Sequence, residues 1–214
     1  MLIQSVRVVH RSQKEKSRKI RHLIAGETCK KSIGKIYKGM EIFGLNGGQY
    51  SIINIIEHIL EQTVNADVDI STWSAANVEI KIAENLLINN KIKNLRFLLD
   101  RGFPSRQPKY YSMLMKRFGE KSVRLARIHC KFIIIRNKKW NITIRTSMNL
   151  NENKRLENFE ISDDLNLCKY LTEIIDEYFE NPLDYKGYDI IKQRDDKSEI
   201  TKDFHDWSFV YGNR

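Results

Sequence analysis

Residues 128–164, IHCKFIIIRNKKWNITIRTSMNLNENKRLENFEISDD, decide the fold. A continuous apolar run at 132–135 is followed by a polar turn at 136–139 and by alternating apolar positions at 140–144. Two strand-like segments joined by a short polar turn are typical of a β-hairpin. We therefore predict a hairpin here, with one strand on each side of the turn.

Polar side chains stand at both ends of the predicted hairpin. His129 and Lys131 are two positions apart beside the first strand, so their side chains are predicted to leave the same face. Ser147 and Asn149 repeat this spacing at the end of the second strand, and Glu160 follows. An imidazole, an ammonium, a hydroxyl, an amide and a carboxylate can together cleave a phosphodiester without a metal ion or other cofactor, and none is expected.

The ordered set resembles the signature of the phospholipase D superfamily. That signature is His, any residue, Lys, then Gly-Ser-any-Asn downstream, and then Asn-any-Glu. The resemblance covers residues 43–180 and implies an α/β fold, a layered sandwich in which a mixed central sheet is flanked by helices. Residues 140–164 are also similar to phospholipase D-like proteins of Mu-like prophages. The matching segments are His129-Cys-Lys131, Thr146-Ser147-Met-Asn149 and Asn158-Phe-Glu160.

The resemblance implies a role for each side chain of the set. His129 would be the nucleophile that forms a covalent phosphohistidine. Lys131 would place a positive charge on the phosphoryl oxygens, and Ser147 and Asn149 would donate hydrogen bonds to them. Glu160 would accept the second ring N–H of a histidine and fix its tautomer.

Three departures from the family pattern are visible, and one assignment is open. Arg136 stands where the family has an Asp that is structural more than chemical, and Thr146 replaces the Gly before the Ser. The interval between the two halves of the motif is three residues longer than usual, which the turn around Asn137 could absorb. Glu157 competes with Glu160 for the carboxylate role, and we favour Glu160 because it fits the family segment.

The superfamily uses two copies of the motif, and this chain has one. One histidine acts as the nucleophile and the other as the general acid. The resemblance therefore implies a homodimer in which His129 of both subunits meets at a two-fold axis, the commonest symmetry of oligomers.

Charge distribution indicates a polyanionic partner. The net charge is +10, and residues 1–40 carry 11 lysines and arginines against two glutamates. Residues 151–214 carry 9 basic against 16 acidic side chains, which leaves a basic middle part. Such a surface attracts nucleic acid, DNA or RNA, through counterion release. The alternative is a solvated lysine-rich surface without a partner.

Neither a membrane-spanning segment nor a secretory signal is visible, so no membrane partner is expected and the protein is predicted to be cytoplasmic. The three cysteines are widely spaced, as reduced thiols would be. Cys130 is expected to point to the buried face opposite His129. The histidines without a partner pattern are expected at surfaces or interfaces: His10, His22, His58 and His205.

Three segments are predicted along the chain. Residues 1–40 form a basic N-terminal extension that is partly helical, 41–182 the phospholipase D-like domain, and 183–214 a polar acidic segment. Within the domain, Ser51 is a plausible helix cap and Gly119 a helix stop. Periodicity predicts helices at 51–63, 77–89, 108–118 and 167–179, and strands at 43–45, 68–73, 95–99 and 123–125.

Two functions compete. The first is a metal-independent phosphodiesterase, a nuclease, that acts on DNA or RNA as a homodimer. The second is a nucleic-acid-binding protein on the same fold that is catalytically weak or inactive. A phosphatidyl transferase or lipase is a third, weaker reading, because the chain offers no apolar interfacial segment.

Overall fold

A computed structural model describes residues 7–12, 19–22, 28–152 and 154–180, and only the backbone of the first two of these ranges. The chain divides into two compact units, of which the first ends at Glu180. Residues 181–214, and with them the predicted acidic segment and His205, lie outside the described residues. The predicted boundaries at residues 40 and 182 stay predictions.

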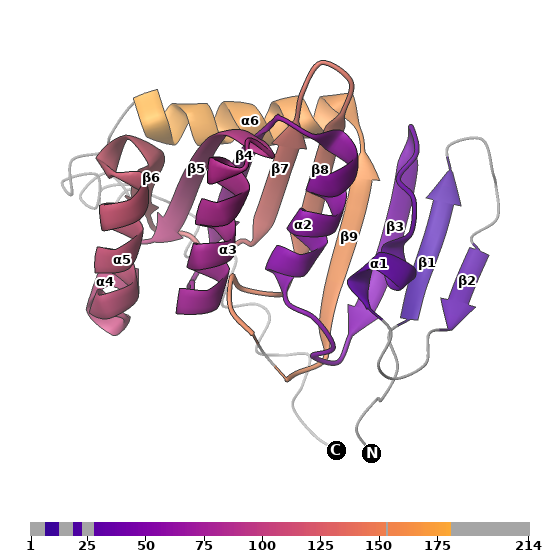
Figure 1. Cartoon of the computed structure of the whole chain (residues 1–214), viewed down its shortest axis with the longest axis horizontal. Helices are drawn as coiled ribbons and strands as arrows, with labels where there is room; N and C mark the ends of the chain where they lie inside the picture. Colours follow the sequence, from indigo (N-terminus) through magenta and orange to yellow (C-terminus); the bar gives the residue numbers. More distant parts are fainter. Residues whose placement is uncertain (1–6, 13–18, 23–27, 153, 181–214) are drawn as a thin grey trace, which may run out of the picture. The chain divides into compact units, whose positions relative to one another are not determined.

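A single nine-stranded sheet forms the centre of the first unit, in the order β2-β1-β3-β9-β8-β7-β4-β5-β6 (Figure 1). The strands β4, β5 and β6 are parallel, and every other neighbouring pair is antiparallel. The strands are β1 (Arg7–Ser12), β2 (Lys19–His22), β3 (Met40–Asn46), β4 (Ala66–Thr72), β5 (Ile92–Asp100), β6 (Val123–Ala126), β7 (Phe132–Arg136), β8 (Asn141–Thr146) and β9 (Glu157–Asp163).

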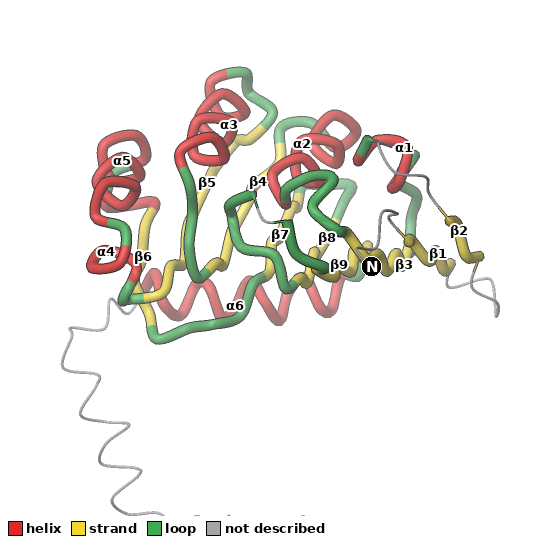
Figure 2. The backbone as a smooth tube through the Cα atoms, turned by 90° about the horizontal axis from the view of Figure 1, so that it is seen from below, coloured by secondary structure: helices red, strands yellow, loops and turns green. Residues whose placement is uncertain are grey.

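Helices cover both faces of this sheet. Figure 2 shows helices α1 to α5 on one face and α6 along the other. The expected α/β layered sandwich, with a mixed central sheet flanked by helices, is therefore confirmed. No helix in the described part of the chain is both long and apolar enough to cross a membrane. The helices are α1 (Cys29–Ile33), α2 (Ile52–Thr63), α3 (Asn77–Ile88), α4 (Phe103–Arg106), α5 (Pro108–Phe118) and α6 (Leu165–Glu180).

Strand alternation separates two apolar layers. In β7, Ile133 and Ile135 pack in the large core under α2 and α3, whereas Phe132 and Ile134 pack in the smaller core under α6. Successive side chains of a strand point to opposite faces, so a strand buried on both faces reads as a continuous apolar run. This explains the apolar run at 132–135.

A buried charge network crosses the sheet on the α6 face. Asp69 in β4 is 1% exposed and accepts hydrogen bonds from Arg96 in β5, with Nε–Oδ1 at 2.6 Å, and from Arg136 in β7. Arg96 also pairs with Asp176 of α6 at 2.7 Å. Arg136, the departure from the family pattern, is thus the cation of a pair whose carboxylate comes from the neighbouring strand.

The helices and the hairpin that periodicity predicted are confirmed within a few residues. Helix α5 begins at Pro108 and ends before Gly119, whose φ is +74°. Three strands were not predicted. Strand β9 contains the Asn-any-Glu segment, and strands β1 and β2 occupy part of the N-terminal region, where helix was expected and only α1, among the described residues, is helical.

Gly44 of β3 lies opposite Phe159 of β9, and the phenyl ring covers the glycine. A Cβ on Gly44 would lie 2.1 Å from the nearest ring carbon of Phe159, which is fully buried. Overpacking of a core position costs about 1–3 kcal/mol. We expect Gly44→Ala to lower the free energy of unfolding by about this amount, measured by urea denaturation.

A double-mutant cycle checks the cause. In a Phe159→Leu background the smaller side chain leaves room for the new methyl group, so Gly44→Ala should cost less there. An equal cost in both backgrounds would contradict the steric explanation.

Candidate functional site

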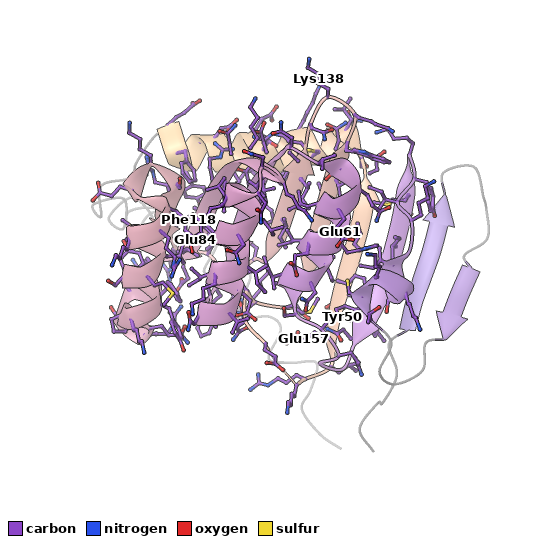
Figure 3. The ribbon with its side chains drawn as sticks, in the orientation of Figure 1. Tyr50, Glu61, Glu84, Phe118, Lys138 and Glu157 are labelled. Atoms are coloured by element: carbon purple, nitrogen blue, oxygen red, sulfur yellow. The ribbon has the colours of Figure 1, made fainter. Side chains whose placement is uncertain are left out.

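Strand ends from both halves of the sheet meet at one edge. Strands β3, β4, β5, β6 and β8 end at this edge, and β7 and β9 begin there, as the pairing directions require. Figure 3 places Glu157 at this end and Lys138, in the hairpin turn, at the other. Four of the five predicted site residues are close in sequence to the strand ends of this edge, and Glu160 lies further along β9.

His129 and Lys131 lie in the segment that leads into β7. The Lys131 Nζ atom is 3.3 Å from both ring nitrogens of His129. The two side chains thus lie on the same side, as predicted, although this segment is not part of the strand that the spacing argument assumed. His129 is exposed, whereas Lys131 is partly buried. Burial lowers the pKa of Lys131, and the negative charge of Glu157 opposes this shift.

Ser147 follows β8 and is hydrogen-bonded to the start of β9. Its hydroxyl donates to the carboxylate of Glu157 and accepts from the backbone N–H of Asn158 at 3.0 Å. The hydroxyl of Thr146 donates to the carbonyl of Asn158 at 2.7 Å and accepts from the N–H of Met148 at 3.0 Å. A glycine could not make these two bonds, so Thr146 fixes the turn that carries Ser147.

Asn149 lies on the same turn, where it runs beside the end of β4. The N–H of the next residue, Leu150, donates to the hydroxyl of Thr72 and to the carbonyl of Ser74, both at 3.1 Å. The Oδ1 atom of Asn149 is buried and has no hydrogen-bond partner among the described residues. A buried amide oxygen without a donor is costly, which is typical of strained or functional positions.

Glu160 is not brought together with the other four residues. It forms an ion pair with Arg145, its neighbour across β8 and β9. Phe159 and Ile161 face the large core, so Glu160, between them, faces the α6 side. Glu157 is two residues before Phe159 and therefore lies on the same face of the sheet as Phe159. The carboxylate that the structure places beside Ser147 and Lys131 is therefore Glu157. Strand parity within β9 was the signal that could have identified it.

Two further expectations, about Cys130 and His58, are wrong. Cys130 is exposed, whereas burial was expected, because residues 127–131 precede β7 and do not follow its alternation. The segment is held instead by Ser71, whose hydroxyl donates to the carbonyl of Cys130 at 3.1 Å. His58 is also buried, although it was expected at a surface.

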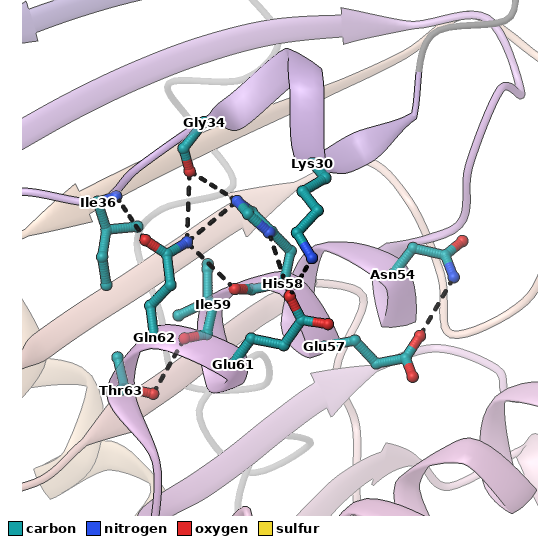
Figure 4. A network of polar contacts seen from close by, with 10 residues as sticks. All are labelled: Lys30, Gly34, Ile36, Asn54, Glu57, His58, Ile59, Glu61, Gln62 and Thr63. Atoms are coloured by element: carbon teal, nitrogen blue, oxygen red, sulfur yellow. Dashed lines mark hydrogen bonds and ion pairs between the residues drawn. The ribbon is translucent and has the colours of Figure 1, made fainter.

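A polar network between α1 and α2 explains the burial of His58 (Figure 4). Its Nε2 atom is 2.6 Å from the carbonyl oxygen of Gly34, and Nδ1 is 4.0 Å from a carboxylate oxygen of Glu61. Gln62 accepts from the N–H of Ile36 at 3.0 Å and completes the link. The network joins the segment after α1 to α2. The side chains of His10 and His22 lie outside the described residues.

Two residues beside His129 were not identified from the sequence as a site. Trp73 is half-buried, and its ring meets that of His129 at a centroid distance of 5.9 Å and an angle of 63°. The guanidinium carbon of Arg106 lies 3.9 Å from the centre of the Trp73 ring. These residues belong to different segments, so no local pattern links them to His129.

No family model matches the chain, and no curated protein matches it. Among solved structures, it is similar to "NucT from Helicobacter pylori" with a TM-score of 0.46 and 16% identity, over 58% of this chain and 87% of that one. It is also similar to TrmBL2, described as an archaeal chromatin protein that shows a novel mode of DNA binding, with a TM-score of 0.42 and 12% identity. That match covers 69% of this chain and 54% of TrmBL2, about half of its length.

The placement of Glu157 can be tested without any assay of function. Because the charge of Glu157 raises the pKa of Lys131 against the effect of burial, Glu157→Gln should lower this pKa further. An NMR titration of the Lys131 side chain measures the shift. Glu160→Gln is the matched control on the other face of the sheet and should leave the titration unchanged. Equal shifts in both variants would contradict the assignment.

Proposed function

We propose that this chain is a metal-independent phosphodiesterase that cleaves DNA or RNA through a phosphohistidine at a homodimeric site. The observation that carries the proposal is the contact between His129 and Lys131 at the same sheet edge as Ser147 and Glu157. An exposed imidazole beside a partly buried ammonium provides a nucleophile together with a charge for the phosphoryl oxygens.

The proposed reaction has two displacements at phosphorus. In the first, a ring nitrogen of His129 forms a P–N bond while the P–O bond to the leaving oxygen breaks, and His129 of the partner subunit donates a proton to that oxygen. In the second, water attacks phosphorus after His129 of the partner subunit takes a proton from it. The P–N bond then breaks, and both histidines return to their starting states.

Lys131 stabilises the charge on the non-bridging oxygens in both steps. Ser147 can donate to the same oxygens only if its hydroxyl leaves Glu157, since a hydroxyl has one hydrogen. The negative charge of Glu157 opposes the lowering of the Lys131 pKa by burial and so favours the protonated form. In this proposal Glu157 acts through Lys131 and Ser147, and Asn149 adds an amide beside them.

Nucleic acid is the proposed substrate because the chain is strongly basic, with a net charge of +10. Phosphate contacts of lysine and arginine supply most of the non-specific affinity for DNA and RNA. Each chain carries one copy of the motif and therefore one such histidine. A second histidine is needed to protonate the leaving oxygen, so we infer a dimer.

One observation favours the alternative, a nucleic-acid-binding protein that is catalytically weak or inactive. Glu160, which stands in the family segment, is paired with Arg145 on the opposite face of the sheet and not with the His129 ring. The carboxylate of the family segment therefore does not fix the tautomer of the nucleophile. The cleavage assay decides between the two functions.

The first test is cleavage of a phosphodiester in EDTA. Wild-type protein should release product from DNA or RNA, and His129→Ala should lower the rate roughly 10⁴-fold or more, because the attacking nitrogen is lost. Retained binding without any cleavage by the wild-type protein would establish the alternative function.

A mixing experiment tests the shared site. Wild-type and His129→Ala subunits are exchanged at varying ratios, and the rate is measured per total protein. If each site requires His129 of both subunits, the rate follows the square of the wild-type fraction. A linear dependence would contradict the shared site and leave the nucleophile assignment intact.

A further prediction concerns the dependence of the cleavage rate on pH. Lys131 acts while protonated, and burial lowers its pKa from the ordinary value of 10.5. The rate should therefore fall on the alkaline side at a lower pH than an ordinary lysine would produce. Lys131→Arg should shift this decline to higher pH, because a guanidinium stays protonated. An unchanged alkaline decline in this variant would assign it to another group.

A further inference from the structure

Arg106 and Trp73 form a stacked pair beside the proposed nucleophile. The guanidinium of Arg106 covers one face of the indole at 3.9 Å, and the indole meets the imidazole of His129 with its rings at 63°. Trp73 follows the end of β4, and Arg106 closes the short helix α4 that follows β5. The pair thus joins two neighbouring strand ends at the same edge as His129.

Arg106 is held in this position by several independent contacts. Its Nη1 atom lies 2.6 Å from Oδ1 of Asp100, and its Nη2 atom donates to the carbonyl of Trp73 at 3.0 Å. Gly102 leaves the necessary space, because a Cβ there would lie 2.4 Å from Nη1 of Arg106. The same Asp100 oxygen accepts from the N–H of Gly102 at 3.1 Å.

The stacked pair remains accessible despite these contacts. The side chain of Arg106 is 35% exposed, and Trp73 is half-buried. The comparable pairs formed by Arg96 and Arg124 with Phe179 differ, because they join β5 and β6 to α6 on the other face of the sheet. Only the pair at Trp73, among the described cation–aromatic pairs, contacts the His129 ring.

We propose that Arg106 and Trp73 form a stacking platform for an unpaired nucleobase next to the phosphodiester that His129 attacks, which makes single-stranded nucleic acid the preferred substrate. This proposal rests on the proposed function and names the substrate class for the same site. Aromatic rings and arginine planes are the surfaces on which proteins stack unpaired bases. A base in a duplex already stacks on its neighbours and does not offer its face.

The stacking contribution can be separated from the charge contribution by removing bases and keeping phosphates. Binding is measured by fluorescence anisotropy with the full-length chain in a His129→Asn background, which leaves the strand intact. The probes are a labelled oligonucleotide, a strand of the same length built from abasic sites, and the corresponding duplex. All three carry the phosphates that give the electrostatic part of the affinity.

The parent protein should bind the intact single strand about tenfold more tightly than the abasic strand, as expected for one stacked base. Trp73→Leu should reduce this ratio towards one and leave the affinities for the abasic strand and the duplex unchanged. Gly102→Ala should also reduce the ratio, because it displaces the Arg106 guanidinium without removing its charge.

Lys139→Gln is the matched control for Arg106→Gln. Lys139 also lies over a tryptophan, 5.3 Å from the centre of the Trp140 ring, but in the hairpin turn at the opposite end of the sheet. Both variants remove one positive charge. Arg106→Gln should reduce the ratio of intact to abasic affinity, whereas Lys139→Gln should leave this ratio at the parent value.

Three results would overturn the platform. Equal affinity of the parent protein for intact and abasic strands would refute stacking and leave the proposed function standing. A loss of affinity in Trp73→Leu that is equal for all probes would assign the pair a structural role. Failure of the parent to bind any of the probes at low salt would refute the nucleic-acid substrate as well as the platform.

Discussion

The carboxylate of Asp69, buried between two guanidinium groups, is the interaction on which the rest of the sheet depends. Arg96 reaches it from β5 and Arg136 from β7, so one charge joins the parallel half of the sheet to the antiparallel half. Asp176 extends the network to α6. Removing one member of such a buried group leaves an uncompensated charge, which is strongly destabilising. The network therefore fixes the neighbours of β4, and with them the positions where the chain leaves the sheet.

That constraint determines where the residues of the proposed site lie. Strand β7 is fixed beside β4, so the segment carrying His129 and Lys131 enters the sheet next to the residue that follows β4, Trp73. Strand β8 returns from the hairpin turn and delivers Ser147 to the same edge, where its hydroxyl bonds join it to β9. The residues of the proposed site at this edge are thus supported by backbone pairing on both sides.

Much of this arrangement could be predicted from apolar periodicity, because helices and strands bury their faces at characteristic spacings. The apolar run at 132–135 identified the hairpin. The contact between His129 and Lys131 was expected from strand spacing but forms in the segment before β7, outside the strand. Strand parity was decisive where the prediction differed, since Glu157 and Glu160 are three residues apart and lie on opposite faces. The contact of Arg106 with Trp73 depends on the connection between two strands, which no local sequence pattern specifies.

The exposed thiol of Cys130 makes this edge of the protein chemically addressable. The other two cysteines are buried, and burial raises the pKa of Cys29 to about 12 and raises that of Cys168. Thiolates are the reactive species, so a maleimide or a spin label would be directed to Cys130 in the folded chain. The residue between His129 and Lys131 therefore offers a natural attachment point for a spectroscopic reporter, without any engineered cysteine.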